Sequence, residues 1–243
     1  MAASERILLI ETSGRGGFAA LAQGETLLAT AELAADRQHA RDLAPLVAGL
    51  LREAGWAAQQ VQAVVVSRGP GSFTSLRVGV MSAKAFAYAV GCTLLAVDTF
   101  DCYAHQCPPE WSAVEVIGDA QQRRVQVQRY QRSEPTTFSA SEPASFTATE
   151  PIRIVPIEAW LSQRPAHVPV TGPALALVRD RLPSETPIAP PAQCVVMPGT
   201  LLKLGLARLR RGESDSVWAL EPLYAQLSSA EEKQARSNPA SAP

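Results

Sequence analysis

The feature that most constrains this fold is a change in the period of the apolar residues near residue 40. Three strand-like segments come first, at residues 7–10, 18–22 and 26–33, and the first is a continuous apolar run typical of a strand buried on both faces. The apolar positions from 43 to 54 then recur at helical spacing, and a second helix at 74–90 lies between strands at 61–66 and 93–97. Three strands followed by helix, strand, helix and strand predict a mixed α/β layer with helical crossovers.

A weaker version of the same order follows in the second half of the chain. Strands are predicted at 113–117, 125–130 and 168–171, helices at 157–163, 173–182 and 199–211, and a loop or exposed edge hairpin at 135–151. One detail of the first half stays open, because Pro45 requires its helix either to begin near Asp42 or to kink. We predict an N-terminal domain over 1–105, a smaller C-terminal α/β domain over 106–228 and a disordered tail over 229–243.

Composition narrows the class of protein. Hydrophobic residues make up 47% and charged residues 19% of the 243 residues, which is typical of a globular chain. The formal charge of −1 argues against a stand-alone nucleic-acid binder, which carries a basic face. No apolar run reaches the roughly 20 residues of a membrane helix, and the start lacks a secretory pattern. Four cysteines without a CxxC pair and three separated histidines predict neither a disulfide scaffold nor a zinc site, so we expect a cytoplasmic protein without a metal.

The most distinctive segment is RGPGSFTSLRVG at residues 68–79, between a predicted buried strand and a predicted helix. Exposed N–H groups at such a helix start can hold an anion. Gly69 and Gly71 permit a tight turn, and Ser72 or Thr74 can cap the helix. The segment lacks the lysine and the spacing of a Walker P-loop, and it is not GxGxxG. Two interpretations stay open, a capped strand-to-helix turn and a loop that contacts a ligand.

This segment closely resembles the GRGPGSFTGLRIG signature of the bacterial TsaB (YeaZ) proteins. The chain departs from the family pattern at three places: Glu11 replaces the usual aspartate, Ser75 replaces the usual glycine, and Gln121-Gln122 interrupts a hairpin motif. The resemblance extends over nearly the whole chain. Four shorter matches occur in the family's order: residues 10–13 are similar to its IDTS opening, 37–41 to its RQHSE segment, 119–125 to its DARRGEVY hairpin and 221–224 to its ELxPLYLR segment.

The resemblance to TsaB implies an α/β fold of the actin-like ATPase (Hsp70/sugar kinase) class, built from two RNase H-like halves with mixed sheets. It also implies a non-catalytic scaffold that supports a TsaD-like catalytic subunit, together with a TsaE-like ATPase. The product of that complex is N6-threonylcarbamoyladenosine at position 37 of ANN-decoding tRNAs. Alone, the chain is expected to form a homodimer, with tRNA bound mainly through the complex and no contact with a membrane.

In the TsaB family, the two long helices of the N-terminal half pack against the equivalent pair of TsaD. The matching helices here lie at about 38–54 and 74–90. For the apolar members of the expected interface, the alternative is packing against the protein's own sheet, and for the charged members it is exposure to solvent. Eight residues are predicted to form the partner interface: Leu43, Val47, Leu50, Leu76, Arg77, Val80, Ala83 and Lys84.

The resemblance assigns a second set of residues to a vestigial nucleotide loop: Glu11, Thr12, Ser13, Gly69, Gly71 and Ser72. We expect no firmly bound cofactor there, with ATP or ADP confined to the interface with the partner. No serine or cysteine has an identifiable base in its own motif, so we predict no catalytic residue. The alternative function is an enzyme of the same fold. It would be either an ATP-dependent phosphotransferase that uses Glu11 and the glycine loop, or an M22-type peptidase, for which paired histidine ligands are missing.

A direct contact with tRNA is a further hypothesis. Arg123, Arg124, Arg129 and Arg132 fall in one strand-like segment, and basic side chains in such an arrangement can contact phosphates. Exposed hairpins are also commonly charged, so both interpretations stay open.

Overall fold

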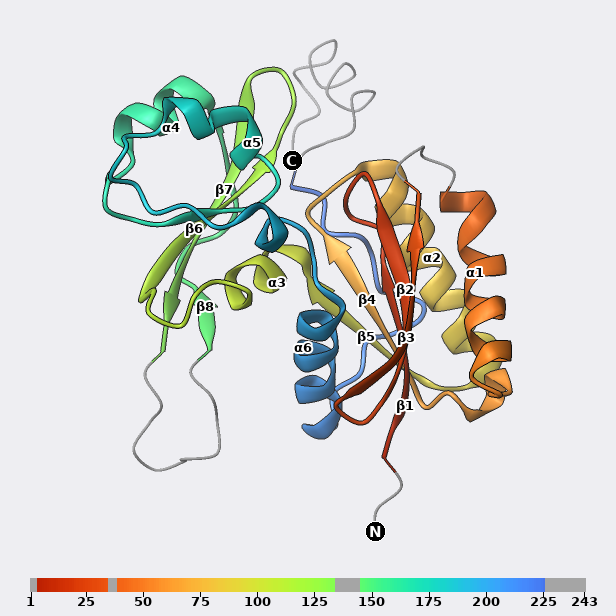
Figure 1. Ribbon diagram of the computed structural model, residues 1–243. Helices are drawn as coiled ribbons and strands as arrows, with labels where there is room; N and C mark the ends of the chain where they lie inside the picture. The colour runs from red at the N-terminus through yellow and green to blue at the C-terminus, as the bar shows by residue number, and fades with distance from the viewer. Residues whose placement is uncertain (1–3, 35–38, 134–144, 226–243) are drawn as a thin grey trace.

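In the computed structural model, which describes residues 4–34, 39–133 and 145–225, the chain forms two sheets that lie side by side with helices between and around them (Figure 1). The predicted tail at 229–243 and most of the predicted loop at 135–151 lie outside the described residues.

The first sheet has the strand order β3-β2-β1-β4-β5. Its first three strands form an antiparallel meander, and β4 and β5 continue the sheet parallel to β1. Leu8 and Ile10 pack under helices α1 and α2, whereas Ile7 and Leu9 face the opposite core. The elements are β1 (Arg6–Glu11), β2 (Gly17–Gln23), β3 (Thr26–Leu33), α1 (His39–Glu53), β4 (Ala63–Gly69), α2 (Phe73–Val90) and β5 (Thr93–Asp98), with a 3-10 turn at Ala58–Gln60.

The second sheet repeats the start of the first. Strand β6 pairs antiparallel with β7 and parallel with β10, as β1 pairs with β2 and β4. Helices α4 and α5 cover one face of this sheet. The elements are β6 (Ala113–Asp119), β7 (Arg124–Arg132), β8 (Phe146–Ala148), β9 (Arg153–Pro156), α4 (Ile157–Gln163), β10 (Val170–Thr171) and α5 (Leu175–Val178), with 3-10 turns at Arg179–Arg181 and Pro191–Gln193.

The space between the sheets is filled by two further helices, α3 (Thr99–His105) and α6 (Pro198–Arg210). One apolar core includes residues from both sheets and both helices. Helix α6 lies so close to β4 that a Cβ on Gly205 would be 2.5 Å from the side chain of Val65. The segment after α6 also returns to the first sheet, where the N–H of Asp215 donates to the carbonyl of Leu94. The predicted C-terminal domain over 106–228 is therefore corrected, because the part from α6 onward packs on the first half.

Local differences from the predicted elements have identifiable causes. Helix α1 begins at His39, in agreement with the helix expected at about 38–54, and it contains Pro45. Of the two alternatives for Pro45, the start near Asp42 is therefore excluded, and Pro45 lies on the exposed side of the helix. The predicted helix at 173–182 is a short α-helix followed by a 3-10 turn. Helix α3 and strand β9 were not predicted, since each is too short to show a clear period.

Candidate site at the glycine-rich loop and the outer helical face

The glycine-rich loop at 69–72 joins β4 to α2. Gly69 has a φ of +117°, and a Cβ at this position would lie 2.6 Å from the carbonyl oxygen of Leu223. A Cβ on Gly71 would lie 2.4 Å from the carbonyl oxygen of Ser13. The loop is therefore held between two segments of main chain. Both glycines are explained by this close packing without any ligand.

The six residues predicted as a nucleotide loop come together in the structure, and their polar groups bond to the protein itself. The N–H of Ser72 donates to the carbonyl oxygen of Ser13 at 2.8 Å. The N–H of Ser13 donates to Oε1 of Glu11 at 2.6 Å, and the Ser13 hydroxyl donates to the same oxygen. The Thr12 hydroxyl donates to the carbonyl oxygen of Ser75 at 2.8 Å. The arrangement thus closes the loop against the end of β1.

Glu11 is the carboxylate that would have to position a metal–phosphate group in such a loop. It is 4% exposed, and its Oε2 has no hydrogen-bond partner among the described residues. Burial raises the pKa of Glu11 above its ordinary value, opposed by the hydrogen bonds from Ser13. Burial therefore opposes the charged carboxylate that a metal–phosphate group would need at this position.

Six of the eight residues predicted at the partner interface lie in the protein's own core. Each helix turns its largest apolar stripe toward the first sheet, because burying that stripe against the strands removes the most apolar surface from water. The alternative of packing against the protein's own sheet is therefore the correct one for these residues. They are at most 8% exposed: Leu43, Val47, Leu50, Leu76, Val80 and Ala83.

Arg77 and Lys84, the two charged members of the predicted interface, hold the C-terminal segment against α2. Arg77 Nε donates to the Tyr224 hydroxyl at 2.9 Å, and its guanidinium lies 4.1 Å from the centre of the Phe73 ring. Lys84 Nζ donates to the carbonyl oxygen of Leu220 at 2.8 Å. Neither side chain is simply solvated, and the segment that they hold passes beside the glycine-rich loop at Leu223.

The outward face of α2 carries apolar side chains that were not assigned to the interface from the sequence. Met81 is 58% exposed, Tyr88 is 66% exposed, and Trp218 of the C-terminal segment is 77% exposed. Tyr88 and Trp218 make an edge-to-face contact with ring centres 5.2 Å apart. On the neighbouring helix α1, Ala44 and Ala48 are exposed. Helical spacing opposite to the buried stripe is the signal that identifies the positions on α1 and α2, whereas Trp218 lies outside a helix and has no such signal. We call Met81, Tyr88, Trp218, Ala44 and Ala48 the outer helical face.

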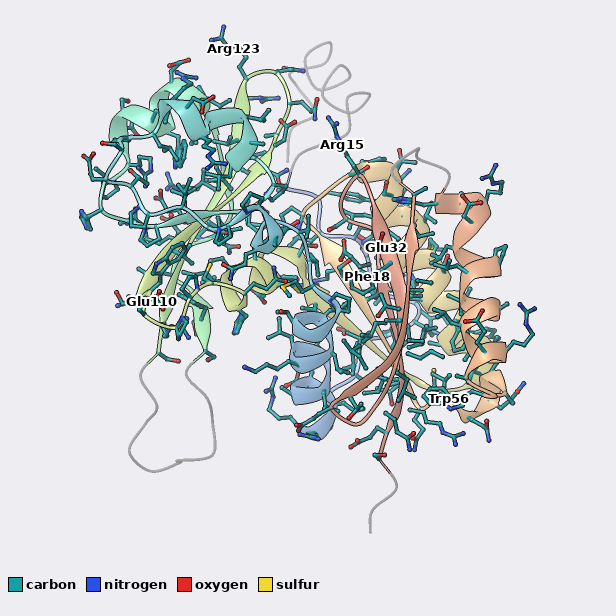
Figure 2. The ribbon with its side chains drawn as sticks, in the orientation of Figure 1. Arg15, Phe18, Glu32, Trp56, Glu110 and Arg123 are labelled. Atoms are coloured by element: carbon teal, nitrogen blue, oxygen red, sulfur yellow. The ribbon has the colours of Figure 1, made fainter. Side chains whose placement is uncertain are left out.

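The four arginines considered for tRNA contact are in different surroundings. Arg129 donates to buried Glu115 at 2.8 Å, and Arg132 donates to the carbonyl oxygens of Trp111 and Pro108. Arg124 lies 3.4 Å from Gln122, and Arg123, at the tip of the β6–β7 hairpin, lies 3.4 Å from Glu158 (Figure 2). Only Arg123 combines a side chain that is 85% exposed with a place at a hairpin tip.

Two further features bear on the kinds of site that the described part of the chain can form. Histidine, cysteine and acidic side chains do not gather there in any group that could hold a metal ion. No helix in residues 4–34, 39–133 and 145–225 is long and apolar enough to cross a membrane.

Comparisons with known proteins agree with this geometry. The sequence profile of the family described as TsaD, tRNA N6-adenosine threonylcarbamoyltransferase, matches residues 32–154. The chain is 31% identical over 131 residues to the tRNA threonylcarbamoyladenosine biosynthesis protein TsaB of Escherichia coli, covering 53% of this chain and 56% of that protein. It is 30% identical over 125 residues to the protein of the same name from Bacillus subtilis, covering 51% and 55%. The chain thus spans about half the length of these curated relatives.

A solved structure agrees over a longer stretch. A Pseudomonas aeruginosa protein described as similar to the peptidase YeaZ superposes with a TM-score of 0.74 at 23% identity, covering 91% of this chain and 100% of that one. This likeness and the strand order of the two sheets confirm the predicted fold class.

Proposed function

Because the chain belongs to the TsaD-related family and within it to the TsaB (YeaZ) group, we propose that it acts in tRNA threonylcarbamoyladenosine biosynthesis as a non-catalytic partner of a TsaD-like subunit. The observation that carries this proposal is the outer helical face, where Met81, Tyr88 and Trp218 leave apolar surface exposed and the neighbouring helix α1 exposes the small residues Ala44 and Ala48. Large exposed apolar side chains next to small ones are typical of a surface that receives a partner helix.

A non-catalytic role is supported by the way the loop residues use their polar groups. The N–H and the hydroxyl of Ser13 both donate to Oε1 of Glu11, and the main chains of Ser13 and Leu223 take the space beside the two glycines. Under this proposal ATP or ADP binds at the interface with the partner, a TsaE-like ATPase joins the TsaD-like subunit, and tRNA is bound mainly by the complex. Without the partner, the same face would join two copies of the chain.

The test is tRNA modification by a purified TsaE and a TsaD from the same source, supplied with the threonylcarbamoyl-adenylate donor by the separate enzyme TsaC, with and without this chain. We expect modification to depend on the chain, and the chain alone to be inactive. Met81→Glu and Tyr88→Glu should each weaken the complex with TsaD at least tenfold, because each places a charge in an apolar contact. Leu177→Glu is the matched control, since Leu177 is 53% exposed on α5, in the other half of the molecule.

The outcomes separate the alternatives. Modification that is equally efficient without the chain would contradict the proposed role. An affinity unchanged by both Met81→Glu and Tyr88→Glu, in variants that fold normally, would contradict the proposed face while leaving the role intact. Nucleotide hydrolysis by the purified chain, abolished by Glu11→Gln, would favour the phosphotransferase alternative.

A further inference from the structure

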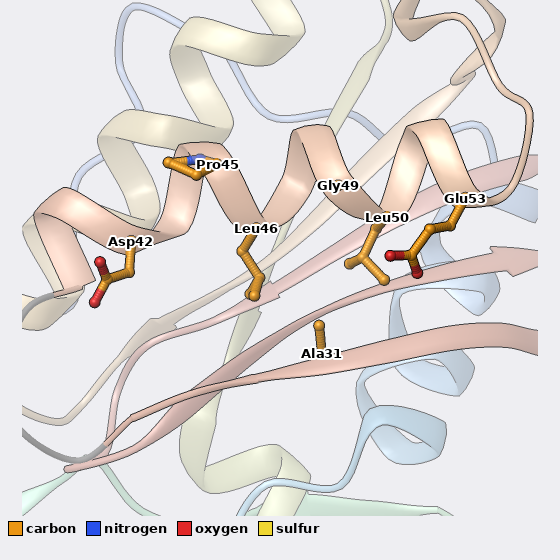
Figure 3. A pocket seen from close by; sticks show the side chains of 7 residues that line it. All are labelled: Ala31, Asp42, Pro45, Leu46, Gly49, Leu50 and Glu53. Atoms are coloured by element: carbon orange, nitrogen blue, oxygen red, sulfur yellow. The ribbon is translucent and has the colours of Figure 1, made fainter.

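A second surface lies at the opposite edge of the first sheet, between α1 and β3. The stripe of α1 that includes Asp42, Leu46, Leu50 and Glu53 faces Ala31 of β3 (Figure 3). These residues line a pocket of about 360 Å³, with Gly49 leaving its rim open. Leucine side chains form the middle of the stripe, and a carboxylate stands at either end (Figure 3). We call this the α1–β3 pocket.

The strand beside the pocket has an open edge. Strand β3 is the terminal strand of the first sheet, so its outer N–H and C=O groups pair with no other described strand. Edge strands are usually protected by proline, by lysine or by a bulge. Strand β3, with the sequence TLLATAEL, has neither proline nor lysine, and its one charged side chain is the exposed Glu32. A register shift opposite Leu21 and Ala22 disturbs only its first part, and residues Ala29–Leu33 pair regularly with β2.

The carboxylates at the two ends of the pocket determine which kind of partner segment can pair with the edge of β3. Glu53 is exposed and makes no ion pair with a described residue. Asp42 accepts hydrogen bonds from Arg41 on both of its carboxylate oxygens, at 2.6 and 3.1 Å, so Glu53 is the stronger attraction for a basic side chain. The eleven helical steps from Asp42 to Glu53 correspond to about 16 Å along a helix. In an extended segment, residues four apart point to the same side and span about 13 Å. This is shorter than the distance of about 16 Å between the two carboxylate positions, and long basic side chains can reach across the difference.

We propose that the open edge of β3 binds an extended segment of a partner protein by strand addition, and that the segment carries a basic residue two positions before and two positions after an apolar one. The apolar side chain enters the α1–β3 pocket between Leu46 and Leu50, and the basic side chains approach Asp42 and Glu53. Main-chain hydrogen bonds to residues 29–33 supply the pairing. Self-pairing of two β3 edges is disfavoured, because it brings the carboxylates of two copies together. This inference does not depend on the proposed function.

The experiment uses the full chain and three labelled peptides of seven residues. The first is Thr-Lys-Thr-Val-Thr-Lys-Thr, the second has Glu in place of both Lys, and the third has Pro in place of the two Thr residues that flank Val. Fluorescence anisotropy measures affinity, and amide hydrogen exchange locates the binding. We expect the first peptide to bind at least tenfold more tightly than the other two and to protect the amides of residues 29–33.

Two variants test the pocket itself. Glu53→Gln should weaken binding about two- to fivefold, in the range of an exposed ion pair, whereas Glu110→Gln, which removes an exposed carboxylate of the other half (Figure 2), should not. Gly49→Met should abolish binding by filling the pocket. It should not unfold α1, because a Cβ on Gly49 meets nothing within 4 Å and methionine favours a helix more than glycine does.

Three results would overturn the proposal. Equal binding of the basic and acidic peptides would remove the charge argument, and equal binding of the proline peptide would remove strand addition. Protection confined to another part of the chain would place the site elsewhere. Concentration-dependent dimerisation in sedimentation velocity that is abolished by the variant Gly49→Met would identify a second copy as the occupant instead.

Discussion

The hairpins that open the two halves occupy equivalent places in the repeated topology but end differently. In the first, Glu11 at the end of β1 is buried and accepts hydrogen bonds from Ser13. In the second, Asp119 at the end of β6 is exposed and accepts a hydrogen bond from the N–H of Gln121 at 2.7 Å. One strand end is thus part of the core, and the other only stabilises its own turn.

The two strand ends differ in burial because the glycine turn of each half packs at a different position along its hairpin. In the first half, Gly71 packs against the carbonyl oxygen of Ser13, two residues beyond Glu11. In the second half, Gly172 after β10 packs against the main chain of Ile117, two residues before Asp119: a Cβ on Gly172 would lie 2.4 Å from the carbonyl oxygen of Ile117. The tip of the second hairpin is left uncovered by that turn. Equivalent topology therefore does not give equivalent sites, because a shift of a few residues decides whether a strand end is buried.

The largest expected effect concerns the charge inside β6. Strand β1 is apolar from Ile7 to Ile10, whereas β6 carries Glu115, which is 1% exposed and lies 3.5 Å from the buried side chain of Arg164. Glu115→Ala should lower the free energy of unfolding by about 3–5 kcal/mol, because it leaves the buried guanidinium without its partner. Urea unfolding measures this.

The double variant Glu115→Leu/Arg164→Met is the control, since it makes β6 as apolar as β1. It should recover at least half of the loss, because replacing a buried pair by apolar residues is often neutral. A loss below about 1 kcal/mol for Glu115→Ala would show that water reaches this pair and that the two strands differ less than their burial indicates.

The next effect concerns the closure of the first hairpin. Gly71→Ala should lower the free energy of unfolding by about 1–3 kcal/mol, because the new Cβ would lie 2.4 Å from the carbonyl oxygen of Ser13 and 2.8 Å from its Cβ. Gly199→Ala at the start of α6 is the control, since a Cβ there meets nothing within 4 Å. If both variants have wild-type stability, the loop is not packed against β1 as described.

The sequence was sufficient for the order of the elements because long periodic runs, such as Ile7–Ile10 and the stripe from Leu43 to Leu51, carry their own signal. The sequence was not sufficient to decide which way the apolar residues of α2 face. A stripe such as Leu76 and Val80 can face a sheet or a partner, and only the position of the sheet decides between them. The signature loop was located correctly from its glycines. The contact of Gly69 with Leu223 could not be predicted, because the two residues are far apart in the sequence.

The buried carboxyl of the first hairpin should make stability depend on pH. Because burial raises the pKa of Glu11 above 4.5, the folded chain holds this proton more firmly than the unfolded chain does. The contribution of this proton to the free energy of unfolding is fully present below pH 4.5. It is lost as pH rises through the raised pKa of Glu11, by at most about 1.4 kcal/mol per pH unit. Glu11→Gln should remove this part of the slope in urea unfolding between pH 4 and 8.

Asp101 acts in the same direction, since burial raises its pKa to about 6. Its contribution is present in the wild type and in Glu11→Gln alike, so it cancels in the difference between them. Equal slopes for the two proteins would mean that Glu11 is ionised in the folded chain, and that the first hairpin is as open to solvent as the second.

The smallest effect concerns the uncovered tip of the second hairpin. The backbone φ values of Gln121, Gln122 and Arg123 are 60°, 52° and 60°. Residues other than glycine and asparagine rarely adopt such values. Arg123 stands where the DARRGEVY motif of the TsaB family has its glycine. Arg123→Gly should therefore raise the free energy of unfolding by up to about 1 kcal/mol.

Arg123→Ala is the matched variant, because it removes the same contact with Glu158 but keeps the Cβ. Thermal unfolding of the two variants separates the backbone from the ion pair: only the glycine variant should be stabilised relative to the wild type. If alanine stabilises the chain as much as glycine, the arginine side chain and not the left-handed backbone is the unfavourable element. The second hairpin would then differ from the first in charge, and its uncovered tip would carry no backbone strain.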